Sequence, residues 1–258
     1  MSTILYPSPI FGPVRSRRLG VSLGINLMPG DGKICTFDCI YCECGRNSER
    51  RPLQKRPSPA EVSSSLKIKL EEMRQKNEAP DVLTFAGNGE PTAHPNFAEI
   101  VDDTIRLRNI YYPEAKISVL SNGTRLSDKA VFNALLKVDN NIQKLDTVNP
   151  YFIETVNCPV ANYNLQNTIN DMISFNGHII IQTLFLTGYC NGKNLDNTGD
   201  EYVLPWIDIL KKISPSEVMI YTLDRETPVT GLKKASSKAL NRIVSKLKEN
   251  GLKAKASY

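Results

Sequence analysis

Cysteine and histidine are scarce in this chain of 258 residues, which contains six cysteines and two histidines. Four of the cysteines fall within residues 35–44, while Cys158 and Cys190 stand alone. Scattered cysteine pairs are typical of secreted, disulfide-bonded domains, so this clustering instead indicates metal chemistry in a reducing compartment. His94 and His178 have no spacing typical of metal ligands, and we interpret both as structural residues.

Long apolar runs are also missing. The most apolar segment, residues 179–181, ends at Gln182 and is much shorter than the roughly 20 residues that cross a bilayer. The N-terminal residues do not follow the charged, apolar and small-residue order of a signal peptide. We therefore expect a cytoplasmic protein with no membrane partner. No linker or shift in composition divides the chain, so we expect one domain over residues 1–258.

Positive charge is unevenly distributed, although the formal net charge is only +5. One excess lies in residues 233–258, where Lys238, Arg242 and Lys246 repeat opposite an apolar stripe, as on the solvated face of a helix. The other lies in residues 15–56, on both sides of the clustered cysteines, and is able to attract phosphate groups. It includes the arginines at positions 15, 17 and 18.

Apolar patterning predicts six strands, each followed by a helix. The strands are expected at residues 20–27, 81–87, 115–123, 142–148, 178–186 and 217–223. The sequence SPAE at 58–61 is a capping box that marks the start of the first helix. Regular alternation predicts an α/β fold with a parallel sheet and helices outside, and six units rather than eight predict an open, partial (β/α)6 barrel.

Polar side chains follow the predicted strands, and the carboxyl ends of parallel strands are where such folds bind ligands. The segment GNGEP (87–91) follows the second strand, and Asn122 follows the third. Asp146 and Gln182 lie at later strand ends. We therefore expect these residues to gather at one edge of the sheet, beside the clustered cysteines.

The clustered cysteines read CTFDCIYCEC from residue 35, so Cys35, Cys39 and Cys42 have the spacing C-x3-C-x2-C. A 4Fe-4S cluster ordinarily takes four thiolates, and a protein that supplies three leaves one iron open, as in catalytic metal sites. Cys44 offers an alternative, because a fourth thiolate would complete a zinc-binding module or an iron-sulfur electron carrier. Zinc sites, however, usually pair two C-x2-C units that lie apart in sequence.

These motifs together resemble the radical S-adenosylmethionine (SAM) superfamily. The resemblance lies in the C-x3-C-x2-C spacing with Tyr41 before the third cysteine, in its place after the first strand, and in the segment GNGEP. That segment is similar to the glycine-glycine-glutamate element of the family, with Asn88 inserted between the glycines. The resemblance extends over nearly the whole chain.

The resemblance implies a 4Fe-4S cluster on Cys35, Cys39 and Cys42, with SAM bound at the fourth iron. It implies an enzyme that splits SAM to a 5′-deoxyadenosyl radical, which takes hydrogen from a substrate, with an electron donor such as flavodoxin or ferredoxin. The residues that it implies for SAM binding are Tyr41 near the adenine, Gly87, Asn88, Gly89 and Glu90 near the ammonium group, and Asn122, Asp146 and Gln182 near the ribose and carboxylate.

Two further stretches, GPVRSRRLG (12–20) and YTLDR (221–225), resemble short radical SAM proteins related to the tRNA-wyosine-synthesising enzymes. This resemblance implies a tRNA base as a possible substrate, and the basic residues beside the cysteines suit a phosphate backbone. The alternatives are an activase of a glycyl-radical enzyme or a peptide-modifying enzyme. Cys44, Cys158 and Cys190 have no assigned role at this point, and a spare thiol is the interpretation for Cys44.

Overall fold

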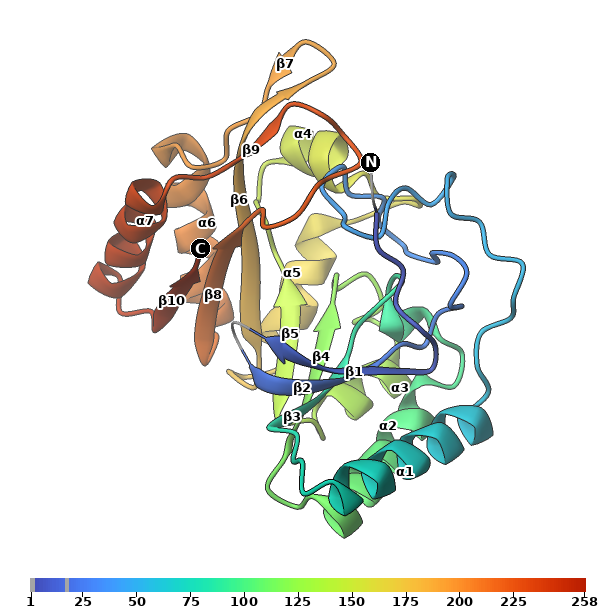
Figure 1. Ribbon diagram of the computed structural model, residues 1–258. Coiled ribbons are helices and arrows are strands. Elements are labelled where there is room, and N and C mark those ends of the chain that lie inside the picture. The colour runs from blue at the N-terminus through green and yellow to red at the C-terminus, as the bar shows by residue number, and fades with distance from the viewer. Residues whose placement is uncertain (1–2, 17–18) are drawn as a thin grey trace.

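The computed structural model describes residues 3–16 and 19–258 (Figure 1). The strands are β1 (Ile10–Ser16), β2 (Gly20–Ile25), β3 (Val82–Phe85), β4 (Lys116–Ser121), β5 (Asn140–Lys144), β6 (Ile180–Cys190), β7 (Lys193–Asn194), β8 (Glu217–Thr222), β9 (Leu232–Lys234) and β10 (Ala254–Ser257). The main helices are α1 (Pro59–Gln75), α2 (Phe97–Tyr111), α3 (Lys129–Leu135), α5 (Leu165–Ile173), α6 (Asp200–Ile213) and α7 (Ser237–Glu249). Short helical turns are η1 (Pro91–Ala93), α4 (Pro150–Phe152) and the π-helical η2 (Ile153–Asn157).

The strands form one mostly parallel sheet with the order β1-β2-β3-β4-β5-β6-β8-β10. Each strand from β2 to β10 is parallel to its neighbour on this path, and β1 alone is antiparallel. Within the described residues, β1 and β10 are the two edges of the sheet. The predicted α/β fold with an open parallel sheet is therefore confirmed.

The helices lie on the outer face of this sheet (Figure 1). α1 begins at the predicted capping box, where the Ser58 side chain accepts from Glu61 N and the Glu61 carboxylate accepts from Ser58 N. Its apolar stripe, which includes Leu66 and Leu70, is fully buried and joins the main core with the apolar stripes of the other long helices. Burying these stripes supplies much of the free energy that holds the helices to the sheet.

The inner face of the sheet changes from apolar to polar along the strands. Near the amino ends it is apolar, with Ile142, Ile180 and Met219 packed together. Two residues further along β5 the same face carries Lys144, paired in register with Gln182. Strand periodicity places these polar side chains inside the partial barrel, on the side of the strands' carboxyl ends.

The two ends of the sheet differ in shape. A cavity of about 860 Å³ opens among the amino ends of the strands, lined by residues that include Asp81, Lys116, Asn140, Glu217 and Lys255.

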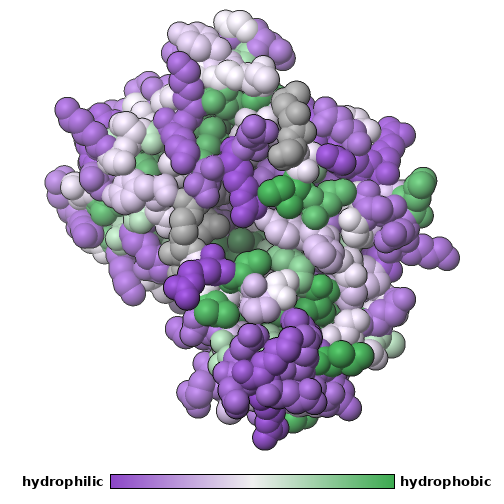
Figure 2. Space-filling view, in the orientation of Figure 1, coloured by the Kyte–Doolittle hydropathy of each residue, from purple (hydrophilic) through white to green (hydrophobic). Residues whose placement is uncertain are grey.

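The face in Figure 2 is mostly hydrophilic, with apolar side chains gathered around a central hollow. In the part of the chain that the structure describes, no helix is long and apolar enough to cross a membrane.

Candidate functional site

The cysteine-containing segment, residues 33–47, follows β2 and precedes α1. Within it, Cys39 and Cys44 are buried, whereas Cys35 and Cys42 are partly exposed. Its backbone is held by η2 and the residue after it, because Ile40 N donates to Val156 O at 2.9 Å and Asp38 N donates to Cys158 O at 2.9 Å. The segment after β5 therefore shapes the one that carries the thiols.

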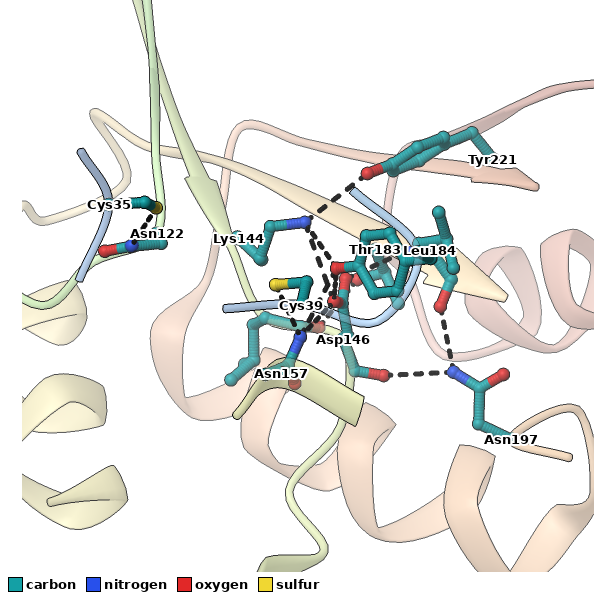
Figure 3. Close-up of polar contacts among 12 residues, drawn as sticks. Cys35, Cys39, Asn122, Lys144, Asp146, Asn157, Thr183, Leu184, Asn197 and Tyr221 are labelled. Atoms are coloured by element: carbon teal, nitrogen blue, oxygen red, sulfur yellow. Dashed lines mark hydrogen bonds and ion pairs between the residues drawn. The ribbon is translucent and has the colours of Figure 1, made fainter. Parts of the chain in front are cut away.

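Each of the three spaced thiols has a polar or charged side chain nearby. Asn122 Nδ2 lies 3.7 Å from Cys35 Sγ, and Asn157 Nδ2 lies 3.7 Å from Cys39 Sγ (Figure 3). The charge of Lys33 lowers the pKa of the third, Cys42. Such neighbours stabilise the thiolate form, which is the form that binds metals.

The thiol pKa values follow their surroundings. Burial raises the pKa of Cys39 to about 11 and also raises the pKa of Cys35. The pKa of Cys42 is lowered to about 6, first by a hydrogen bond with the Cys44 thiol and then by Lys33. Cys42 is therefore the thiol that loses its proton most easily.

Cys44 is turned toward the protein backbone. Its Sγ donates to Gly87 O at 3.4 Å, and the neighbouring Cys42 together with burial raises its pKa. In residues 3–16 and 19–258, no three Cys, His, Asp or Glu side chains converge on the position of a single metal ion. The interpretation of Cys44 as a spare thiol stays a prediction.

The GNGEP segment lies directly against the cysteine-containing segment. Ile34 and Gly89 form an isolated parallel bridge, in which Ile34 N donates to Asn88 O at 3.0 Å and Glu90 N donates to Ile34 O at 3.1 Å. Gly89 has a φ of +139°, and a Cβ there would lie 1.8 Å from Ile34 O. Only glycine permits this approach of the two backbones.

The Asn88 side chain holds the N-terminal segment at Tyr6 against the GNGEP segment. Asn88 is fully buried, and its side chain accepts from Tyr6 N at 2.8 Å and donates to Tyr6 O at 2.9 Å. It also donates to Pro29 O at 2.9 Å. The residue inserted between the glycines thus fixes the N-terminal segment, and only its backbone faces the cysteine-containing segment.

Glu90 is a buried carboxylate at the junction of β3 and β4. It accepts from Thr92 N at 3.0 Å, from Thr92 Oγ1 at 2.6 Å and from Asn122 N at 2.7 Å, and the Ser121 hydroxyl also hydrogen-bonds to it. Burial raises its pKa above the usual value, although these donors oppose the rise. Glu90 therefore ties two strand ends together beside Cys35, whose pKa its charge also raises.

Asp146 organises a second group of buried polar side chains (Figure 3). Its carboxylate accepts from the Tyr41 hydroxyl, from Asn157 Nδ2 at 2.8 Å and from Leu184 N at 2.9 Å. Lys144 Nζ lies 3.6 Å from the same carboxylate and donates to the Tyr41 hydroxyl at 2.8 Å. Asp146 thus fixes the Tyr41 ring within the cysteine-containing segment.

The remaining predicted residues lie on either side of this group. Asn122 donates to Thr36 Oγ1 at 2.8 Å as well as facing Cys35. Gln182 is 6% exposed, and within the described residues its side chain has no hydrogen-bond partner. The structure therefore gathers Glu90, Asn122 and Asp146 just after the carboxyl ends of their strands. Gln182 differs from the prediction, because β6 continues to Cys190 and Gln182 lies near its start, beside Lys144 at the end of β5.

Three site residues were missed from the sequence, namely Lys33, Lys144 and Asn157. Lys144 had a detectable signal, because it stands between Ile142 and Asp146 on the inward face of a predicted strand. Burial lowers its pKa, but the charges of Asp146, Tyr221 and Cys39 raise it to a greater extent. Lys33 and Asn157 had no such signal, since Lys33 lies in an irregular segment and Asn157 ends the short π-helical turn η2.

The other residues singled out from the sequence are Arg225, the two isolated cysteines and the arginines at positions 15, 17 and 18. Arg225 of YTLDR donates to Glu43 Oε2 at 2.6 Å and to the Tyr6 hydroxyl at 2.8 Å. Cys158 and Cys190 line one small cavity of about 310 Å³, which Arg46 also borders. Arg17 and Arg18, the candidates for RNA contact together with Arg15, lie outside the described residues.

The donor chemistry of this site suits an iron-sulfur cluster. Its three spaced thiols are soft ligands, and Cys35 and Cys39 each lie 3.7 Å from a side-chain amide nitrogen. Hydrogen bonds to the ligand sulfurs are typical of iron-sulfur clusters. The glycine-rich backbone beside them supplies carbonyl acceptors at close range. The residues present therefore fit the cluster that three cysteines imply.

Sequence comparison finds relatives that align with most of this chain. A UPF0026 protein of Methanocaldococcus jannaschii is 29% identical over 241 residues, which cover 91% of this chain and 70% of that protein. A UPF0026 protein of Helicobacter pylori is 29% identical over 220 residues, which cover 84% of this chain and 66% of that protein. This chain thus corresponds to about two thirds of the H. pylori relative.

Solved structures share the fold at low identity. A radical SAM methyltransferase from Sphaerobacter thermophilus has a TM-score of 0.66 at 14% identity, over 92% of this chain and 66% of that chain. Streptococcus suis SuiB bound to S-adenosylmethionine has a TM-score of 0.63 at 13% identity, over 91% of this chain and 50% of that chain. The model of the radical SAM superfamily matches residues 31–164, more than half of the chain, and includes both the cysteines and GNGEP. This chain belongs to the radical SAM superfamily.

Proposed function

We propose that this protein is a radical SAM enzyme in which Cys35, Cys39 and Cys42 hold a 4Fe-4S cluster. The observation that carries the proposal is the arrangement of the loop thiols, since Cys35 and Cys39 each face a side-chain amide and the charged Lys33 acts on Cys42. When bound, the cluster and SAM supply a 5′-deoxyadenosyl radical that takes a hydrogen atom from the substrate.

The residues around the thiols would bind and orient SAM. Backbone carbonyls of residues 87–89 would accept from its ammonium group, and the buried charge of Glu90 would favour that cation nearby. Tyr41, fixed by Asp146, would limit where the adenine lies. Asn122 and Gln182 would face its ribose or carboxylate, and Gln182 has donors and acceptors free for this role among the described contacts.

Water exclusion is the other contribution of this site. Asn88, Glu90 and Asp146 are each at most 5% exposed, and their polar atoms are used within the protein. A buried, hydrogen-bonded wall of this kind keeps solvent from a reactive intermediate and preserves its geometry.

The test is SAM cleavage by the reconstituted protein. The chain is loaded with iron and sulfide without oxygen, reduced with dithionite and mixed with SAM, and 5′-deoxyadenosine is measured. We expect product from the natural sequence and from Cys190→Ala, whose thiol lies outside the cysteine-containing segment, and none from Cys39→Ala. A cluster that forms without SAM-dependent cleavage would favour the electron-carrier alternative.

For the substrate we propose a tRNA base. The supporting observation is the basic segment after the thiols, where Arg51 and Lys55 are exposed and have no ion-pair partner among the described residues. Phosphate contacts make binding strongly dependent on salt. We expect tRNA to bind the natural protein, to bind more weakly as salt rises, and to lose affinity in the double variant Arg51→Gln/Lys55→Gln. Binding that salt does not change would favour the alternative of a protein or peptide substrate.

A further inference from the structure

Lys33 is a buried cation within the cysteine-containing segment. Its side chain is only 1% exposed, and its Nζ donates to Gly45 O at 2.7 Å and to Asp38 Oδ1 at 3.4 Å. These contacts join the two ends of residues 33–45, the stretch that carries all four clustered thiols. An ammonium group buried to this extent needs partners that offset its loss of hydration.

The nearby acids do not neutralise this cation fully. Asp38 is the carboxylate in contact with Lys33, and it also pairs with Arg46, whose Nε lies 3.4 Å from Asp38 Oδ2. One acid is therefore shared by two cations. The Arg46 side chain is 28% exposed and more open to screening by solvent, so the Lys33 charge acts more strongly inside the protein.

The thiols and Lys33 affect one another. Burial lowers the pKa of Lys33, but the charges of Cys42, Cys35 and Cys39 raise it to a greater extent. Asn122 and Asn157 lie beside two of these thiols, but their amides are neutral. Lys144 also acts on Cys39, but Asp146 pairs with it at 3.6 Å. Lys33 is thus the buried cation that lies within the cysteine-containing segment itself.

We propose that Lys33 is a positioning residue that raises the reduction potential of the cluster held by Cys35, Cys39 and Cys42; this inference rests on the proposed function. Reduction transfers one electron from an external donor to the cluster and adds a negative charge to the site, while Lys33 keeps its protons. A fixed, buried positive charge near the ligand sulfurs stabilises the reduced state more than the oxidised state.

The test is a redox titration of the reconstituted protein without SAM, followed by the electron paramagnetic resonance signal of the reduced cluster. In Lys33→Gln, which removes the charge, we expect the equilibrium constant for reduction to fall about tenfold, a shift of about 59 mV to lower potential for one electron. Lys33→Arg keeps the charge and should remain near the natural value. Lys55→Gln removes an exposed lysine just after this segment and serves as the matched control.

Asp38→Asn provides a test of opposite sign. It removes the acid that Lys33 and Arg46 share, so the potential should rise, and this result would support the inference even if Lys33→Gln failed to hold a cluster. Equal potentials in Lys33→Gln and Lys55→Gln, or an unchanged potential in Asp38→Asn, would overturn the role of Lys33 and leave the enzyme proposal intact. Failure of the natural protein to bind any cluster would overturn both.

Discussion

The two ends of the partial barrel handle polar groups in opposite ways. At the carboxyl ends, Asp146 and Glu90 are buried and surrounded by donors. At the amino ends, the larger cavity is bordered by Glu217 and Lys255, a pair 3.0 Å apart in which the lysine side chain is 43% exposed. The candidate functional site therefore lies at the densely packed end, and the cavity of about 860 Å³ lies at the other end.

This difference shows that the cavity of about 860 Å³ and the candidate functional site lie at opposite ends of the strands. Buried charges are costly unless each is paired and hydrogen-bonded. At the carboxyl ends, the loss of one partner would therefore leave another buried charge without its contacts. Partly exposed charges at the amino ends keep much of their hydration and need no such set. Substitutions at the two ends should accordingly have unequal effects.

Gly89→Ala should have the largest effect. A Cβ 1.8 Å from Ile34 O forces the GNGEP segment away from the cysteine-containing segment, and we expect a loss of roughly 4 kcal/mol or more in the free energy of unfolding, with little cluster bound. Urea denaturation and iron content would measure both. Gly192→Ala is the control, because Gly192 has a φ of +75° and nothing within 4 Å, so only a backbone cost of about 1–2 kcal/mol is expected.

Asp146→Asn should come next. It leaves the Lys144 ammonium buried without its ion-pair partner, and we expect a loss of about 3 kcal/mol in the free energy of unfolding, measured by urea denaturation. Adding Lys144→Met to this variant removes the unpaired charge and should restore part of the stability. A double variant less stable than Asp146→Asn alone would contradict the assignment.

His94 should make the free energy of unfolding depend on pH. Its Nε2 donates to Pro57 O at 2.9 Å and its Nδ1 accepts from Asn96 N at 3.1 Å, so the folded state holds a neutral ring. Burial lowers the pKa of His94 below its usual 6.5. The unfolded chain therefore binds more protons below that pH, and the free energy of unfolding falls as pH decreases, by at most about 1.4 kcal/mol per pH unit.

Urea denaturation between about pH 5 and pH 7 would measure this slope. His94→Gln should reduce it, because the replaced side chain does not titrate. His178 is exposed and precedes β6 at the amino ends, so His178→Gln is the matched control substitution. Equal slopes in both variants would remove His94 as the source.

The smallest effect is expected for Glu217→Gln at the amino ends. It breaks the pair with Lys255, which is partly exposed, and should change the free energy of unfolding by less than about 1 kcal/mol. Urea denaturation beside Asp146→Asn gives the direct comparison of the two ends. Equal losses in these two variants would show that the ends do not differ energetically.

Much of the fold was predictable because the central strands have continuous apolar patterns. All six predicted strands are present, and the helices that follow them bury their apolar stripes as expected. The sequence did not reveal β1, whose segment contains proline and pairs with a bulge between Phe11 and Val14, nor β10, which reads AKAS. Both are edge strands, and edge strands form through pairing with a neighbour more than through their own pattern.

The candidate site was predictable where residue type and spacing carry the chemistry. Cys35, Cys39, Cys42 and the GNGEP segment were recognisable from the chain alone, and the structure brings them together. Their specific cluster and SAM roles remain predictions. Asp146 was predicted to face SAM, yet its known contacts fix Tyr41, because three donors and Lys144 surround its carboxylate.

By itself, the sequence determined where the six predicted strands lie along the chain and how the thiols are spaced, because both depend on residues close together in the chain. Only the tertiary structure decided the order of the strands in the sheet and which polar groups surround each sulfur. Asn122 and Asn157 lie 87 and 118 residues from the cysteines that they contact, and the burial of the Lys33 side chain, which is 1% exposed, also depends on the folded chain. Hydrogen bonds and charge effects depend on distance and on exclusion of water, which are set when the strands assemble.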